Sequence, residues 1–233
     1  MRISLVAQLF GEWQEEYQMG RLICVRHGKS AYNALGLWTG HTDVELVAEG
    51  REEARRAGEA IRDIHIHVAH TSMLTRTHQT LAEILTTLGR TDLEPTQHCA
   101  LNERHYGVHT GKNKWEVKDA VGEEEFQRIR RGWDTPIQEG ETLKDVHARV
   151  VPYFEERIKP DLVAGKNVLV VSHGNTLRAL VKHIDGLSEK EIADIEIATG
   201  EVHCYSFSEH GAVVDKEIRT TSIEVDVREP AYA

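Results

Sequence analysis

The chain has 233 residues, of which 40% are hydrophobic and 28% charged, as is ordinary for one globular domain with a sizeable core. Its formal net charge of −10 argues against nucleic acid or an anionic membrane as a partner, because both require a broad basic surface. A local cluster of cations could still bind a small anion. No apolar run approaches the length of about 18 residues typical of a membrane span. Three cysteines cannot all pair with one another, which favours a reduced, cytoplasmic setting.

Residues 1–18 are interpreted as an N-terminal extension. Their apolar run is interrupted by Ser4 and Gln8 and leads to acidic residues, so a signal peptide is not expected. Met19 stands just before the first predicted strand, where such a domain would naturally begin. We therefore hypothesise either that Met19 is the native start or that the preceding segment is a loosely attached helix.

The first stretch with distinctive chemistry is residues 22–33, LICVRHGKSAYN. Its four leading apolar residues predict a strand buried on both faces, as in a parallel sheet, and Arg26, His27 and Gly28 follow directly. Ligands of α/β proteins bind beyond the carboxyl ends of such strands. A cation and an imidazole placed there suit an anionic substrate and a nucleophile or proton carrier. For these three residues alone, an ordinary polar rim is the alternative.

A loop and a short helix are expected next, and they contain Ser30 and Asn33. Thr39 and the Gly40 N–H could donate to phosphate or carboxylate oxygens. A simple turn beside an aromatic residue would have the same sequence, so this signal is weak by itself.

A small-residue stripe predicts a helix over residues 47–62, which begins without a good cap because Val47 stands where Ser or Thr is expected. Alternating Ile and His predict a strand over residues 64–72. His65 and His67 would share one face of it, either as surface histidines or, less favoured, as part of a metal site.

The following helix is predicted to open at residues 72–76 and to end at Gly89, which is a good residue just past a helix. Arg76 in its first turn would stand near the His27 loop, where the amino end of a helix also favours anions.

An extended connection over residues 92–101 leads to the run LNERHYG at residues 101–107. Glu103 is a candidate proton donor and acceptor there, and Arg104 and Tyr106 are candidate substrate contacts. A solvated charged loop is the alternative. Residues 108–140 predict short helices bounded by loops, which could form a lid over a site.

Thr142 and Asp145 predict a capping-box start for a long helix with an apolar stripe, a kink at Pro152 and an end at Gly165. Ser188 and Glu191 are expected to cap a further helix. Residues 201–208 and 212–218 predict a β-hairpin.

Residues 167–175, NVLVVSHGN, repeat the pattern of the first strand. A β-branched apolar run again ends in His-Gly, and a helical segment again follows. If the two strands are neighbours, His27 and His173 lie side by side at their carboxyl ends.

RHG at residues 26–28, followed by the distant SHG at residues 172–174, resembles the histidine phosphatase superfamily, whose members pass a phosphoryl group through the first histidine. LNERHYG, together with TGKNK at residues 110–114 and RRGW at residues 130–133, is similar to its phosphoglycerate mutase branch in particular. General phosphatases of the superfamily usually lack these three runs. The resemblance implies an α/β three-layer sandwich with a mostly parallel central sheet flanked by helices.

The resemblance also implies roles for the candidate residues. His27 would be the nucleophile that forms phosphohistidine, His173 a donor to the transferring oxygens, and Glu103 the group that moves a proton on and off the substrate hydroxyl. Arg26 and Arg76 would complete the catalytic set. The expected substrate contacts are Ser30, Asn33, Thr39, Gly40, Arg104, Tyr106, Lys114, Arg130, Arg131, Gly174 and Asn175.

By the same resemblance, the enzyme would interconvert 3-phosphoglycerate and 2-phosphoglycerate in glycolysis and gluconeogenesis, primed by 2,3-bisphosphoglycerate and without a metal. A homo-oligomer, most simply a dimer, is expected. Residues 19–218 would form the catalytic domain and residues 219–233 a mobile C-terminal tail. A broad-specificity phosphomonoesterase and a non-catalytic phosphoryl-binding protein are the alternatives.

Lys29 departs from the family pattern, which usually has glutamate after RHG. It is either a solvent-facing change or an additional cation at the rim of the site. As a rim cation it would tighten anion binding in a way that weakens with salt.

Overall fold

The computed structural model describes residues 19–219, and their centre is a six-stranded sheet with the strand order β3-β2-β4-β1-β5-β6. β1, β4, β2 and β3 are mutually parallel, whereas β5 and β6 are antiparallel additions at one edge. The predicted mostly parallel sheet is therefore confirmed. The strands are β1 (Gly20–Arg26), β2 (Val68–Thr71), β3 (Thr96–Gln97), β4 (Val168–Ser172), β5 (Val202–Phe207) and β6 (Val213–Arg219).

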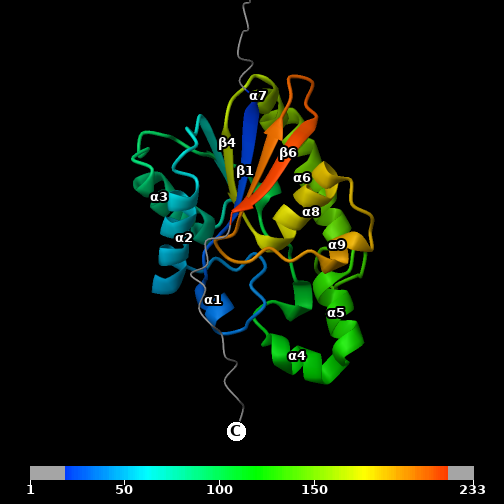
Figure 1. Cartoon of the computed structure of the whole chain (residues 1–233). Helices are drawn as coiled ribbons and strands as arrows, with labels where there is room; N and C mark the ends of the chain where they lie inside the picture. The colour runs from blue at the N-terminus through cyan, green and yellow to red at the C-terminus, as the bar shows by residue number, and fades with distance from the viewer. Residues whose placement is uncertain (1–18, 220–233) are drawn as a thin grey trace, which may run out of the picture.

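Helices cover both faces of this sheet, so the molecule has the three predicted layers (Figure 1). One face carries α2 (Ala48–Ala60) and α3 (Thr75–Thr87); the other carries α6 (Leu143–Tyr153), α7 (Lys159–Val163) and α8 (Gly174–Asp185). The remaining elements are α1 (Ala31–Ala34), η1 (Cys99–Leu101), η2 (Gly107–His109), α4 (Lys114–Val121), α5 (Glu123–Arg131), η3 (Phe154–Ile158) and α9 (Glu191–Asp194).

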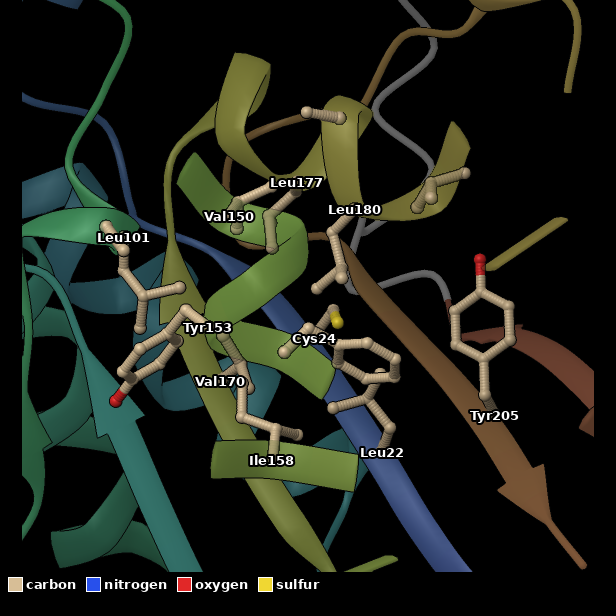
Figure 2. Close-up of a cluster of buried hydrophobic side chains, with 14 of the residues drawn as sticks. Leu22, Cys24, Leu101, Val150, Tyr153, Ile158, Val170, Leu177, Leu180 and Tyr205 are labelled. Atoms are coloured by element: carbon tan, nitrogen blue, oxygen red, sulfur yellow. The ribbon is translucent and has the colours of Figure 1, made fainter. Parts of the chain in front are cut away.

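The apolar runs of β1 and β4 divide between two hydrophobic cores, because successive strand residues point to opposite faces. Leu22, Cys24 and Val170 pack with α6 and α8, as Figure 2 shows. Ile23 and Val171 pack with α2 and α3 on the other side. Burial on both faces explains why these strands have uninterrupted apolar sequences. Because β1 and β4 are parallel neighbours, their carboxyl ends meet at the same edge of the sheet.

A third, smaller core supports α4 and α5, which lie beyond that edge of the sheet (Figure 1). Trp38 and Tyr106 pack there against Phe126 and Ile129 of α5. The segment expected to form a lid is thus a helical pair with apolar support of its own.

The predicted strand over residues 64–72 is wrong at its start, since β2 spans only Val68–Thr71. Ile64 and Ile66 are buried although they lie outside the strand, so their alternation with histidine reflects a loop packed under the sheet. Asn167 holds that loop: its side chain donates to the His65 carbonyl, and its carbonyl accepts from the His67 N–H.

The other predicted helices are present, although their ends differ from the predicted ones by a few residues. Val47, the N-cap residue of α2, makes no side-chain capping bond, and Gly89 follows α3 with φ of +66°. Thr142 and Asp145 form the capping box of α6. After Pro152 the helix continues as the π-helical stretch η3 rather than as a simple kink. The expectations for residues 1–18 and 220–233 lie outside the described residues, and none of the helices in residues 19–219 is long and apolar enough to span a membrane.

Candidate active site

The parallel pairing of β1 with β4 brings the two predicted histidines together. Arg26 is paired with Ser172, and the His27 N–H donates to the Ser172 carbonyl at 2.9 Å. The rings of His27 and His173 lie edge to face, with centroids 5.0 Å apart. Both side chains are almost fully buried. The prediction that these imidazoles meet is confirmed.

The hydrogen bonds of His27 fix its tautomer. Its Nδ1 lies 2.7 Å from the Gly28 carbonyl, and because a carbonyl oxygen can only accept, Nδ1 carries the proton. Nε2 therefore has a free lone pair. Burial, together with Arg76 and Arg26 nearby, holds the pKa of His27 well below its usual value. The ring is thus neutral and nucleophilic at Nε2 at physiological pH.

The opposite tautomer follows for His173. Its Nε2 lies 2.9 Å from the Ser72 hydroxyl. The Thr77 hydroxyl gives its proton to the Leu74 carbonyl, so Ser72 donates to Thr77 and must accept from His173. Nδ1 of His173 is consequently unprotonated, and it is buried without a hydrogen-bond partner among the described residues. Burial and Arg76 hold the pKa of His173 well below its usual value.

His27 faces a cavity at this edge of the sheet, and cations line much of its wall. Six Arg or Lys side chains line it, against two carboxylates, so the cavity is positive within an acidic protein. The lining residues are Arg26, His27, Asn33, Trp38, Thr39, Arg76, Glu103, Tyr106, Lys114, Arg130, Arg131, Gly174, Asn175, Arg178, Glu196 and Ile197.

Backbone carbonyls hold the two arginines nearest to His27. Arg76 donates to Gly40 and Thr42 at 2.9 and 3.0 Å, and Arg26 donates to Ile197 at 2.5 Å. Neither guanidinium forms an ion pair within residues 19–219, and the Nε of each is buried without a partner there. Buried donors of this kind normally have partners, so these two nitrogens are suited to an anionic ligand.

Glu103 faces the same cavity from the loop after η1. Its Oε1 accepts from the Arg104 N–H at 2.8 Å and from both the N–H and the side-chain amide of Asn175 at 3.3 Å. These bonds all use one oxygen, so among the described residues Oε2 is the oxygen left for a substrate hydroxyl. The Tyr106 hydroxyl accepts from the same Asn175 amide at 2.7 Å and links this loop to α8.

Comparison with known proteins decides the family. The model of the histidine phosphatase superfamily (branch 1) matches residues 22–218. The chain belongs to the histidine phosphatase superfamily.

Among curated members of the superfamily, the chain is similar to proteins named 2,3-bisphosphoglycerate-dependent phosphoglycerate mutase. The one from Parvibaculum lavamentivorans is 43% identical over 199 residues, which cover 84% of this chain and 95% of that protein. The one from Cytophaga hutchinsonii is 43% identical, with 80% and 87% covered.

Solved structures show the same fold with varied chemistry. A phosphoglycerate mutase from Bacillus anthracis has a TM-score of 0.72 at 22% identity, covering 88% of this chain and 96% of that one. A mycobacterial glucosyl-3-phosphoglycerate phosphatase complexed with VO3 has a TM-score of 0.71 at 25% identity, covering 80% and 92%.

Three predicted substrate contacts do not line the cavity. Ser30 caps α1 through its bonds to Asn33, and Gly40 supplies the carbonyl that holds Arg76. Arg104 is fully buried, where it donates to the Ile129 and Arg130 carbonyls and stacks over Tyr106. Ser30, Gly40 and Arg104 therefore support the superfamily site from behind it.

His173 is fully buried and is not among the lining residues, but its ring is in edge-to-face contact with that of His27. Lys29 does not line the cavity either: its ammonium pairs with Glu49 at 2.8 Å. This geometry favours the solvent-facing alternative for Lys29. His65 and His67 have ring centroids 4.8 Å apart, but no group of three potential metal ligands gathers anywhere in the described residues.

Four lining residues are not among those predicted from the sequence: Trp38, Arg178, Glu196 and Ile197. Arg178 had a detectable signal, because it lies three residues after Asn175 on the same face of α8 and donates to the Asn175 side chain at 2.9 Å. Glu196 and Ile197 lie in an irregular loop after α9, where no periodicity indicates which side chains face a cavity.

Proposed function

We propose that this protein is a phosphoglycerate mutase that interconverts 3-phosphoglycerate and 2-phosphoglycerate through phosphohistidine at His27. The observation that carries the proposal is the bare Nε2 of a neutral, buried His27 in a cavity lined by six cations. The curated relatives named as mutases support the same reaction.

In the proposed transfer, His27 Nε2 attacks phosphorus, the N–P bond forms, and the P–O bond to the substrate oxygen breaks. Arg26 and Arg76 face the charge that spreads over the phosphoryl oxygens. Each unit charge about 4 Å away contributes roughly 4 kcal/mol at an effective dielectric near 20. Their carbonyl anchors hold both guanidinium groups in place before the substrate arrives.

Glu103 serves as the proton carrier in this proposal. Its free oxygen gives a proton to the departing substrate oxygen and removes one from the attacking hydroxyl in the reverse transfer. The backbone N–H of Asn175, the first-turn residue of α8, and that of Arg104 orient the carboxylate for both steps.

His173 acts through its bare Nδ1. In the free protein, burial disfavours its charged form. An arriving phosphoryl dianion favours that form, so His173 takes up a proton and then donates to a phosphoryl oxygen. The proposal therefore couples binding of the phosphoryl group to proton uptake.

Priming by 2,3-bisphosphoglycerate belongs to the proposal as well. The cavity residues fit such a polyanion, because six cations line it and the Nε atoms of Arg26 and Arg76 lack partners within residues 19–219. When bound, the molecule supplies the phosphoryl group that charges His27. Lys114 of α4 and Arg130 and Arg131 of α5 extend the positive surface beyond the reacting centre, and their helices limit the access of water.

Glycolysis and gluconeogenesis are the proposed pathway setting. A cytoplasmic location and a homodimer complete the proposal. The free state of Cys24, Cys99 and Cys204 is in keeping with a reducing compartment.

An isomerisation assay with 3-phosphoglycerate, run with and without 2,3-bisphosphoglycerate, tests the function. We expect 2-phosphoglycerate to form and its rate to depend on the bisphosphate. Release of inorganic phosphate without isomerisation would instead indicate a phosphomonoesterase, the alternative favoured by the similarity to the mycobacterial phosphatase. Neither activity, together with an unlabelled His27, would indicate a non-catalytic phosphoryl-binding protein.

A further inference from the structure

Glu196 is an unexpected residue in a cavity built for anions. It follows α9, lines the cavity, and directs its carboxylate at two of the cavity's own cations. Glu196 pairs with the Arg131 guanidinium and lies 3.7 Å from Arg130 Nη2. Both arginines are in the last turn of α5, which lies beside α9 (Figure 1).

The arginines that Glu196 contacts belong to α5, whereas Arg26 ends β1 and Arg76 lies in the first turn of α3. Arg76 is anchored to the Gly40 and Thr42 carbonyls, whereas Arg131 is anchored to the Ile195 carbonyl in the loop that carries Glu196. Arg26, next to His27 in the chain, donates to the Ile197 carbonyl of that second loop. Arg26 thus lies between two zones of the cavity. One zone faces the phosphoryl group at His27, and the other faces the remainder of a bound molecule.

Other contacts place Arg131 independently of Glu196. Its guanidinium donates to the Ile195 carbonyl at 3.2 Å, and its own carbonyl accepts from Arg178 at 3.0 Å. Removing the Glu196 charge would therefore leave the cation in place. Half of the Glu196 side chain is exposed, so it can swing away without opening the core.

We propose that Glu196 is an internal counterion of Arg130 and Arg131. The second anionic group of a substrate must displace the Glu196 carboxylate from these arginines, so Glu196 discriminates between ligands with one and with two anionic groups. The inference rests on the proposed function only for the identity of that substrate. A ligand with a single phosphoryl group at His27 does not meet Glu196. A ligand with a carboxylate or second phosphate does, and it loses part of its binding energy to the exchange. The residue lowers affinity for polyanions, and so limits how tightly a doubly charged ligand is held.

A matched pair of unreactive ligands tests this proposal without turnover. 4-Phosphonobutanoate has three atoms between phosphorus and the carboxylate carbon, as 3-phosphoglycerate does, and n-butylphosphonate lacks the carboxylate. Calorimetry measures both dissociation constants for the intact wild-type protein, for Glu196→Gln, and for Glu125→Gln. Glu125 pairs with Arg128 on the same helix but does not line the cavity, so its replacement controls for the loss of one carboxylate.

We expect Glu196→Gln to bind 4-phosphonobutanoate about threefold to fivefold more tightly, in line with the strength of partly exposed ion pairs. The gain should shrink at high salt. Butylphosphonate binding should stay within about twofold, and Glu125→Gln should match the wild type. Equal tightening of both ligands, or no tightening of 4-phosphonobutanoate, would overturn the proposal. Absence of isomerase activity would remove the mutase assignment but leave this result intact, so the two failures are distinguishable.

Discussion

The neutral state of the paired histidines should appear as a loss of stability in mild acid. In the unfolded chain His27 and His173 each bind a proton near pH 6.5, the ordinary value for histidine. In the folded protein, burial and the charge of Arg76 hold both pKa values well below that. As the pH falls below about 6.5, the unfolded state therefore takes up protons that the folded state does not, and stability declines.

The magnitude follows from proton linkage. At pH 5.5, each histidine that stays neutral only in the folded protein costs about 1.4 kcal/mol of unfolding free energy, and the two together cost about 3 kcal/mol. At pH 7.5 the cost is close to zero, since both states are then neutral. Below the folded-state pKa values the loss levels off.

Urea unfolding at pH 7.5 and pH 5.5 measures this effect in the wild type, His27→Asn, His173→Asn and the double variant. Each single replacement should reduce the stability difference between the two pH values by about 1.4 kcal/mol, and the double replacement by about 3 kcal/mol. His210→Asn, at an exposed site, controls for the loss of an imidazole. If the variants keep the wild-type pH dependence, the reasoning that makes His27 a neutral nucleophile is wrong.

Three further perturbations test other parts of the site. Glu103→Gln should lower the turnover number by about 10²- to 10⁴-fold in the isomerase assay, because it removes the proton carrier; a smaller loss would exclude Glu103 from that role. Gly50→Ala should cost about 1–3 kcal/mol in urea unfolding, since its Cβ would lie 2.1 Å from the Lys29 carbonyl, next to the His27 loop. A stabilised Gly50→Ala would show that helix propensity outweighs this overlap. Lys29→Glu should leave the salt dependence of the Michaelis constant unchanged, because Lys29 already pairs with Glu49; a flatter salt dependence would restore its role as a rim cation.

The sequence predicted the structure best where a local hydrophobic pattern directly reflects burial in the fold. β1 and β4 are buried on both faces, so their apolar runs identified the strands, and their carboxyl ends located His27 and His173. Glu103 and Lys114 lie in segments without a strong periodicity. Only the resemblance of their sequence runs to the family distinguished them from solvated charges.

Where the prediction failed, side-chain direction depended on contacts distant in sequence. Ser30 could have been identified as a helix cap, because a reciprocal bond with Asn33 is a local feature. Arg104 gave no such signal, since it turns inward to the carbonyls at the end of α5. Glu196 lies in a loop whose Ile195 and Ile197 carbonyls accept hydrogen bonds from Arg131 and Arg26. These contacts are distant in sequence, so local sequence could not predict that Glu196 faces the cavity.

Transfer of a labelled phosphoryl group to His27 tests the central claim most directly. The protein is incubated with 2,3-bisphosphoglycerate labelled in its phosphoryl groups, and the labelled peptide is then identified. The account predicts label on the peptide containing His27, lost in acid, stable in base, and absent from His27→Asn. Label on another residue, or an unlabelled wild-type protein that still isomerises 3-phosphoglycerate, would contradict it.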